Sequence, residues 1–411
     1  MSANFDYLER LKKVECSDST YPSPEAPLIF DRAEGSTIYD VEGRSYIDLC
    51  GGFGVMSLGH HYPEHKKVFA EFAASKSSGL MHGMGDVYAS RHKVEFIEKL
   101  LSTLPEHINR AALSITGSGA VEIALKTALL RKPSGKIVSF EKAYHGVDLG
   151  ILPLVDRSDF KDPFASWLPS EKVVRLPYNA PQKVIAACFE KEADIAAIIV
   201  EPIQGRGGIV LPYKGWLESL RSFADQSSAL LIFDEIFTGL GRIGVMSSSE
   251  QVKADLICLG KSLGGGLPLS ACCGSSEAFS SWPESKGEAI HTGTFFGHPL
   301  SCQLGKVQLE ALTNYNYPQK NKEKGQSYLD LLIEKLSDLD AVKEIRGEGL
   351  MLGIEFHKQG HGAFAMDELR KSGVIALASG SLGEVLSLTP AFNISDKLFE
   401  SAVEKLRSIL V

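Results

Sequence analysis

The chain has 411 residues, of which 44% are hydrophobic and 23% are charged, and these proportions are ordinary for a soluble globular protein of one large or two medium domains. Its formal net charge of -8 gives no electrostatic reason to expect nucleic acid or an anionic membrane as a partner. Small metabolites are therefore the expected ligands.

The predicted elements begin with a hairpin, because residues 38–48 hold two short β-like runs on either side of a Glu-Gly turn. From about residue 113 to 275, short apolar runs alternate with helical patterns. This alternation is typical of a mainly parallel sheet covered on both faces by helices. We predict strands at 137–140, 173–176, 195–200, 230–233 and 256–259, and helices at 120–130, 181–191, 215–226 and 301–312.

The last part of the chain has a different pattern. It contains a predicted helix near 328–339, a β-like run at 349–356 and a closing helix from Ser395. With the early hairpin, these elements indicate a smaller α+β domain assembled from both chain ends. We predict that residues 1–60 join the small domain, that residues 61–310 form a large cofactor-binding domain, and that residues 311–411 complete the small domain.

Cysteine and histidine spacing gives no sign of disulfides or metals. The seven cysteines are odd in number and form no C-x-x-C pair, which argues against a disulfide framework and a structural zinc site. The eleven histidines include no H-E-x-x-H or similar spacing, so we predict no metal site. The first residues lack a basic segment followed by an apolar one, and no apolar run approaches about 18 residues. We expect a cytoplasmic protein.

Lys261 stands after the apolar run 256–259 and a single glycine, and shortly before the three glycines 264–266. The predicted strand therefore delivers an amine to a turn where a bulky ligand can approach the backbone closely. A lysine partly removed from water has a lowered pKa, and its neutral amine can form a Schiff base with a carbonyl. The alternative for this segment is a lysine on a flexible surface loop.

Glu201 and Asp234 also follow predicted strands directly. In open α/β sheets, ligands bind beyond the carboxyl ends of the strands. A buried carboxylate without a partner is costly, and the protonated pyridine nitrogen of a cofactor would give Asp234 a cationic one. A helix N-cap and an internal ion pair are the alternatives for Asp234.

Small residues and hydroxyls mark two places for a phosphate. Ser118, Gly119 and Ala120 lie where the Ala-rich predicted helix begins, and the free amides and dipole of a helix start attract anions. A serine or glycine there is equally an ordinary cap. Thr294 supplies a second hydroxyl, in another glycine-containing loop.

Tyr144 and His145 follow the predicted strand 137–140. An aromatic ring at this position can stack on a planar cofactor, and Ile236 can pack against the opposite face. Each of these side chains, taken alone, is more often plain core. Together, the features describe a ligand with an aldehyde for Lys261, a ring nitrogen for Asp234, a phosphate and a flat ring, and pyridoxal 5'-phosphate (PLP) has all four.

At this point the chain closely resembles the class III aminotransferases, which are fold-type I PLP enzymes. The matching blocks run over nearly the whole length and include Thr116-Gly-Ser118, Tyr144-His-Gly146, Val200-Glu-Pro-Ile-Gln204, Asp234-Glu-Ile-Phe-Thr-Gly239 and Gly260-Lys261. The resemblance implies an α/β fold whose large domain has a mainly parallel sheet of the seven-stranded type, with a smaller α+β domain. It also implies a homodimer with two active sites at the interface, in which Thr294 reaches the phosphate in the site of the partner subunit.

The activity implied by the resemblance is transamination between a primary amine or amino acid and an aldehyde or keto acid. Lys261 would hold the cofactor as an internal aldimine and then move a proton between the substrate carbon and the cofactor. Asp234 would keep the pyridine nitrogen protonated, so that the ring accepts electrons from the substrate. Glu201 would be a gate that pairs with an arginine.

Two departures from the family pattern concern the substrate. Val147 stands where many relatives have an arginine for a carboxylate distant from the reacting amine, and Ser387 stands where many have the arginine for the α-carboxylate. No other type of side chain presents the planar guanidinium group with which arginine donates two parallel N–H bonds to a carboxylate. We therefore hypothesise a substrate other than a dicarboxylate-like amino acid held by two arginines.

Arg206 and Arg242 are the local candidates for any remaining anion contact, and Phe53 is a candidate for an apolar wall. The alternative for Arg206 is a solvent-facing loop residue. Gly119 and Phe237 replace a common glutamate and a common glutamine of the family, which affects the tuning of the cofactor and not its binding.

Two other functions remain open from the sequence. An isomerase on the same fold, either an aminomutase resembling glutamate-1-semialdehyde mutase or an amino-acid racemase, also accommodates the missing arginines because it begins and ends with one molecule. A non-catalytic protein that retains the fold is disfavoured by the presence of both Lys261 and Asp234.

Overall fold

The computed structural model describes residues 2–20, 27–74, 79–85, 87–192 and 194–411. A seven-stranded sheet is its largest unit, and the strands from β9 to β6 run parallel whereas β10 is antiparallel to both of its neighbours. The order is β4 (Arg110–Ser114), β10 (Ser270–Gly274), β9 (Leu256–Leu259), β8 (Leu230–Asp234), β7 (Ile195–Val200), β5 (Lys136–Phe140) and β6 (Val173–Leu176). The mainly parallel α/β sheet and its five predicted strands are confirmed.

Uninterrupted apolar runs explain why this sheet is covered on both faces. In β7, Ile198 packs in one hydrophobic cluster with Trp216 of α7 (Trp216–Ser227), whereas the next residue, Ile199, packs in another cluster with α4 (Gly117–Arg131). Successive side chains of a strand point to opposite faces, so a strand without polar residues is stable only where both faces are buried.

Further helices complete this part of the chain. Those predicted at 120–130, 181–191, 215–226 and 301–312 are confirmed as α4, α6, α7 and α8. The bounds not yet given are α2 (Pro63–Ala73), α3 (Arg91–Ser102), α5 (Ser158–Lys161), α6 (Gln182–Lys191) and α8 (Pro299–Asn314). No helix in the described ranges is long and apolar enough to cross a membrane.

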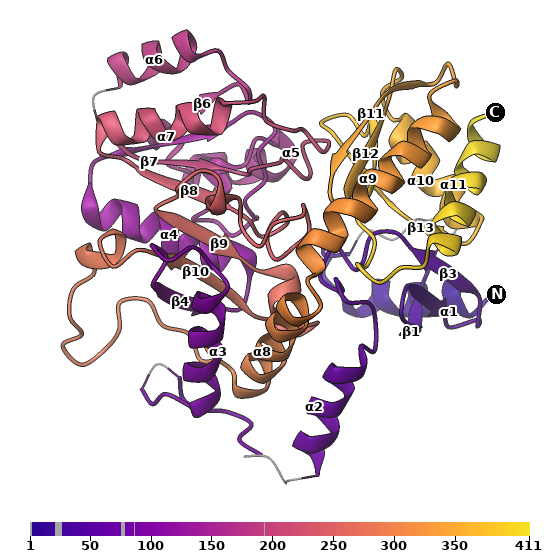
Figure 1. The fold of residues 1–411 in the computed structure, drawn as a ribbon, viewed down its shortest axis with the longest axis horizontal. Coiled ribbons are helices and arrows are strands. Elements are labelled where there is room, and N and C mark those ends of the chain that lie inside the picture. Colours follow the sequence, from indigo (N-terminus) through magenta and orange to yellow (C-terminus); the bar gives the residue numbers. More distant parts are fainter. Residues whose placement is uncertain (1, 21–26, 75–78, 86, 193) are drawn as a thin grey trace.

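Two four-stranded sheets form the smaller part of the molecule, near which both chain termini lie (Figure 1). One contains β1 (Phe30–Glu34), β2 (Thr37–Asp40), β3 (Ser45–Asp48) and β13 (Val374–Ile375), and the other contains β11 (Val342–Glu348), β12 (Met351–Phe356), β15 (Val385–Leu388) and β14 (Leu377–Ser379). The associated helices are α1 (Ala3–Val14), α9 (Tyr317–Leu336), α10 (His361–Lys371) and α11 (Asp396–Leu410). The predicted hairpin is confirmed as β2 and β3, and β3 pairs in parallel with β13 from the other end of the chain. The domain boundaries at residues 60 and 310 stay predictions.

Several elements differ from the prediction. The helix expected near 328–339 begins earlier, at Tyr317. The strands β4 and β10 were not predicted, because small and polar residues dominate both of them. They form strands because β10 pairs in register with β4 and with β9, and such pairing decides strand formation more than intrinsic preference does.

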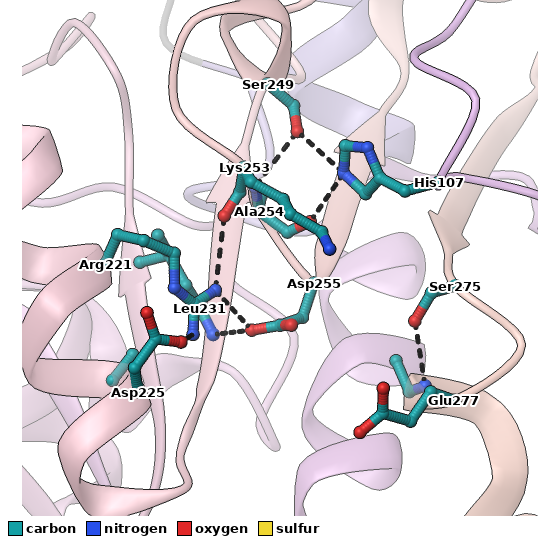
Figure 2. A network of polar contacts seen from close by, with 12 residues as sticks. His107, Arg221, Asp225, Leu231, Ser249, Lys253, Ala254, Asp255, Ser275 and Glu277 are labelled. Carbon is teal, nitrogen blue, oxygen red and sulfur yellow. Dashed lines mark hydrogen bonds and ion pairs between the residues drawn. The ribbon is translucent and has the colours of Figure 1, made fainter.

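A polar network holds the amino ends of β8 and β9 together (Figure 2). Arg221 of α7 donates to the carbonyl of Lys253 at 3.2 Å and to Asp255 Oδ2 at 2.7 Å. The same Asp255 oxygen accepts the N–H of Leu231 at 2.7 Å. Asp255 directly precedes β9, and Leu231 is near the start of β8. The network therefore braces the strands at the end opposite to the functional residues that follow them.

Candidate active site

A cavity of about 490 Å³ brings together most of the predicted site residues beyond the carboxyl ends of the strands. Its lining includes Phe53, Ser118, Tyr144, His145, Glu201, Arg206, Asp234, Ile236 and Lys261. Val147, Phe237 and Ser387, at which the chain departs from the family pattern, line it as well. Residues from distant parts of the sequence thus face one space, as the strand-end argument predicts.

Lys261 begins the short turn after β9 and has a left-handed backbone, with φ of 45°. Such a conformation is uncommon for a residue other than glycine, and strained backbone is often found at functional sites. The amine Nζ lies 4.5 Å from the centroid of the Phe237 ring. Burial lowers the pKa of Lys261 despite the opposing charges of Asp234 and Glu201, and this favours the neutral amine.

Asp234 ends β8 and is only 4% exposed. Its Oδ2 accepts a hydrogen bond from His145 Nδ1 at 2.6 Å, and its Oδ1 accepts the N–H of Ile236 at 3.2 Å. The other ring nitrogen of His145, Nε2, is buried and has no partner among the described residues. A carboxylate that is oriented by an imidazole and faces the cavity suits a protonated ring nitrogen of a ligand.

The start of α4 forms a narrow cradle. Thr116 Oγ1 caps the helix by accepting the N–H of Gly119 at 3.0 Å. A Cβ on Gly146 would lie 2.5 Å from Ser118 Cβ, so only glycine permits this approach. The first amides of a helix bind anions, and the cradle fits a phosphate.

Ser118 has an acidic neighbour in this cradle, because its hydroxyl donates to Asp148 Oδ2 at 2.5 Å. Gly119 and Ala120 are not among the described residues that line the cavity. A Cβ on Gly119 would overlap Ser114 Oγ, and Ala120 is fully buried. Their backbone can therefore support the start of the helix, but their side-chain positions face the core.

Glu201 follows β7, and the protein backbone engages both of its carboxylate oxygens. Oε1 accepts the N–H of Tyr144 at 3.0 Å, and Oε2 accepts the N–H of Gly205 at 3.0 Å. Burial raises the pKa of Glu201 to about 7, although the charge of His145 opposes this shift. The carboxyl thereby connects the Tyr144 loop to the loop that carries Arg206.

The substrate end of the cavity contains a pair of hydroxyls. Ser379 of β14 and Ser387 of β15 line the cavity, and their Oγ atoms are 2.5 Å apart. From the sequence, Ser387 was named only as the residue at a position where many relatives have an arginine, and Ser379 was not named. The signal for Ser379 was the pairing of β14 with β15, which spacing alone does not reveal.

Arg242 and Thr294 also lie outside the cavity lining that the described residues form. Arg242 is 2% exposed and donates to the carbonyls of Leu350 at 3.1 Å and Pro390 at 2.6 Å. Burial lowers its pKa to about 9, and its guanidinium is engaged in holding loops of the smaller part. Thr294 lies on an exposed loop, and its carbonyl accepts a hydrogen bond from His82 Nε2 at 2.5 Å.

The fold and the cavity together define a fold-type I enzyme of the PLP-dependent class, with a lysine after one central strand, a carboxylate at the end of its neighbour and an anion cradle at a helix start. Comparison with known proteins identifies the family. The family model described as Aminotransferase class-III matches residues 20–410. The chain belongs to this family and is a PLP-dependent aminotransferase.

Individual proteins agree with this assignment. The acetylornithine aminotransferase of Methanothermobacter thermautotrophicus is 33% identical over 389 residues, covering 93% of this chain and 94% of that protein. A Bacillus anthracis aminotransferase has the same fold, with a TM-score of 0.90 and 23% identity over 100% of this chain and 99% of that chain. An amine transaminase from an uncultivated Pseudomonas species, solved in its PLP-bound form, has a TM-score of 0.86 and 25% identity over 97% of this chain and 99% of that chain.

Proposed function

We propose that Lys261 is the residue that binds the aldehyde of PLP and moves the proton during transamination, and that Asp234 pairs with the ring nitrogen. The observation that carries the proposal is that the Lys261 amine, the Asp234–His145 pair and the start of α4 open into one cavity. When bound, PLP supplies an aldehyde that condenses with amines and a ring that withdraws electrons from the substrate carbon.

Each side chain has a separate task in this proposal. The lowered pKa of Lys261 keeps a fraction of its amine neutral, which lets it accept and return a proton at the substrate carbon. His145 donates to Asp234 and so keeps that carboxylate turned to the cavity. Ser118 and the first amides of α4 hold the phosphate, while Tyr144 and Ile236 enclose the ring. Glu201 holds the loops of Tyr144 and Gly205 in place.

The proposal includes a homodimer. Thr294 lies outside the cavity of its own chain and on an exposed loop, so it suits a contact with the phosphate in the site of the partner subunit. The protein would work in the cytoplasm, where the seven free cysteines remain reduced. Sedimentation equilibrium tests the dimer, because a species with the mass of one chain would contradict it.

The substrates are an amino donor and a carbonyl acceptor. Acetylornithine is the amino donor that the name of the Methanothermobacter relative points to, but Val147 and Ser387 make a donor held by two arginines a poor fit. The test is a panel of amino donors whose half-reaction is followed by the absorbance of the cofactor. A transaminase leaves the pyridoxamine form when given a donor alone and needs a keto acid to turn over. Conversion of one compound without a co-substrate would instead identify an isomerase.

A further inference from the structure

Arg206 is an exposed residue that places a positive charge at the wall of the cavity. Its side chain lines the cavity, and its guanidinium carbon lies 4.8 Å from the centroid of the Tyr144 ring. An arginine over an aromatic face is held by cation–π attraction and keeps its N–H groups free at the edge. The charge of Arg206 also helps to lower the pKa of Lys261, so the two cationic groups are close enough to interact.

The carboxylates of the cavity do not neutralise this guanidinium. Asp234 is bonded to His145, and Glu201 accepts the amides of Tyr144 and Gly205. Within the described residues, neither carboxylate forms an ion pair with Arg206. A guanidinium at a cavity wall that forms no ion pair with the described residues is ready to bind an anionic ligand.

A second donor lines the same cavity as Arg206. The N–H of Gly380 donates to the carbonyl of Arg206 at 3.0 Å, which joins the Arg206 loop to the residue directly after Ser379. Ser379 and Ser387 share one hydrogen bond between their hydroxyls. Each hydroxyl carries one proton, so the pair keeps one O–H to donate to a ligand.

The other walls of the cavity are mostly apolar. Phe53, Ile203, Phe237 and Leu377 line it, and Thr389 already donates to the carbonyl of Cys50 at 3.1 Å. A ligand that joins Lys261 to the guanidinium and the hydroxyl pair therefore occupies a cavity that hydrocarbon side chains also line. This arrangement matches an amine with a short carbon chain and one carboxylate.

Resting on the proposed function, we propose that Arg206 and the Ser379–Ser387 pair form the carboxylate subsite of this enzyme, and that its amino donors are monocarboxylate amino acids. The carboxylate accepts two parallel N–H bonds from the planar guanidinium and one O–H bond from the serine pair. A single arginine on the loop after β7 thus takes the role of the two arginines that many relatives have at the positions of Val147 and Ser387.

The test compares donors that differ only in the carboxylate. The PLP-loaded enzyme is mixed rapidly with 4-aminobutyrate or n-butylamine, and with 5-aminopentanoate or n-pentylamine, and the second-order rate constant of the cofactor absorbance change is measured. We expect the wild type to prefer the amino acid in at least one pair. Arg206→Gln should reduce that preference about 10- to 100-fold, because a charged bidentate contact is lost. Arg206→Lys should fall in between, because the charge remains without the planar guanidinium group.

Arg32 is a matched control, because its guanidinium carbon lies 3.6 Å from the centroid of the Tyr39 ring and it is not among the residues that line the cavity. Arg32→Gln removes a similar arginine–tyrosine contact and should leave the preference unchanged. Ser379→Ala combined with Ser387→Ala should lower the preference less than Arg206→Gln does. Where the amines react, the proposal is wrong if the wild type prefers neither amino acid, or if Arg206→Gln keeps the wild-type preference.

Calorimetric titration with pentanoate separates this proposal from the proposed function. If no amine of either kind changes the cofactor spectrum, the assignment of the reaction fails. Binding of pentanoate that weakens at least tenfold in Arg206→Gln and not in Arg32→Gln would still support the subsite. Equal pentanoate affinity in the wild type and Arg206→Gln would overturn it.

Discussion

Replacement of His145 tests the buried Asp234–His145 pair at the wall of the cavity. The side chain of His145 is fully buried and Asp234 is 4% exposed, with 2.6 Å between Nδ1 and Oδ2. In His145→Ala, Asp234 keeps only the N–H of Ile236. Leaving a buried carboxylate without its side-chain hydrogen-bond donor costs about 3 kcal/mol, because Asp234 loses the N–H that compensates its burial. His145→Asn should cost about 1 kcal/mol, since its amide presents an N–H near the position of Nδ1.

The free energy of unfolding is measured on the cofactor-free protein by urea denaturation, followed by circular dichroism. His65 is a buried histidine that has no carboxylate partner among the residues that the structure describes. His65→Ala therefore measures the loss of a buried imidazole alone, which we expect to be about 2 kcal/mol. The destabilisation by His145→Ala should also shrink when PLP is bound, because the ring nitrogen then partners Asp234. Equal losses in His145→Ala and His145→Asn would refute the reasoning.

Three further predictions concern Glu201, Asp148 and Arg242. Because the folded-state pKa of Glu201 is raised to about 7 from 4.5, its contribution to stability is present below pH 4.5 and is lost as the pH rises through 7. Between pH 5 and 8, the unfolding free energy of Glu201→Gln should therefore rise relative to wild type by about 2–3 kcal/mol in urea titrations, and a constant difference would contradict the burial argument. Asp148→Asn removes the carboxylate that accepts the Ser118 hydroxyl and should increase the affinity of the apoprotein for PLP about fivefold in fluorescence titrations. The affinity for pyridoxal, which lacks the phosphate, should not increase. An equal increase for both compounds would count against a phosphate at α4. Arg242→Met leaves the carbonyls of Leu350 and Pro390 without their donor and should lower the unfolding free energy by about 2–4 kcal/mol. The preference for 4-aminobutyrate over n-butylamine should stay as in the wild type. A changed preference would show that Arg242 contributes to substrate binding.

The sequence allowed the central sheet and the core of the site to be predicted because both depend on local patterns. The apolar runs that form β7, β8 and β9 each end directly before, or one glycine before, Glu201, Asp234 and Lys261. Parallel strands bring their carboxyl ends to one edge of the sheet. Positions at these ends are therefore close in space even though long stretches of chain separate them.

Other features depend on contacts that no local pattern contains. The hydroxyl pair at Ser379 and Ser387 arises from the pairing of β14 with β15. Arginine often binds anions, but in the folded protein the guanidinium of Arg242 donates hydrogen bonds to two backbone carbonyls. The acidic neighbour of Ser118 is found only when the loop that holds Asp148 is placed against α4.

The central claim is that Lys261 is the residue that binds PLP. Reduction of the PLP-loaded enzyme with borohydride fixes the cofactor to the amine that holds it, and mass spectrometry of the proteolytic peptides locates the label. We predict a single labelled peptide, with the pyridoxyl group on Lys261, and no label in Lys261→Ala. A label on any other lysine of the wild type would contradict the account.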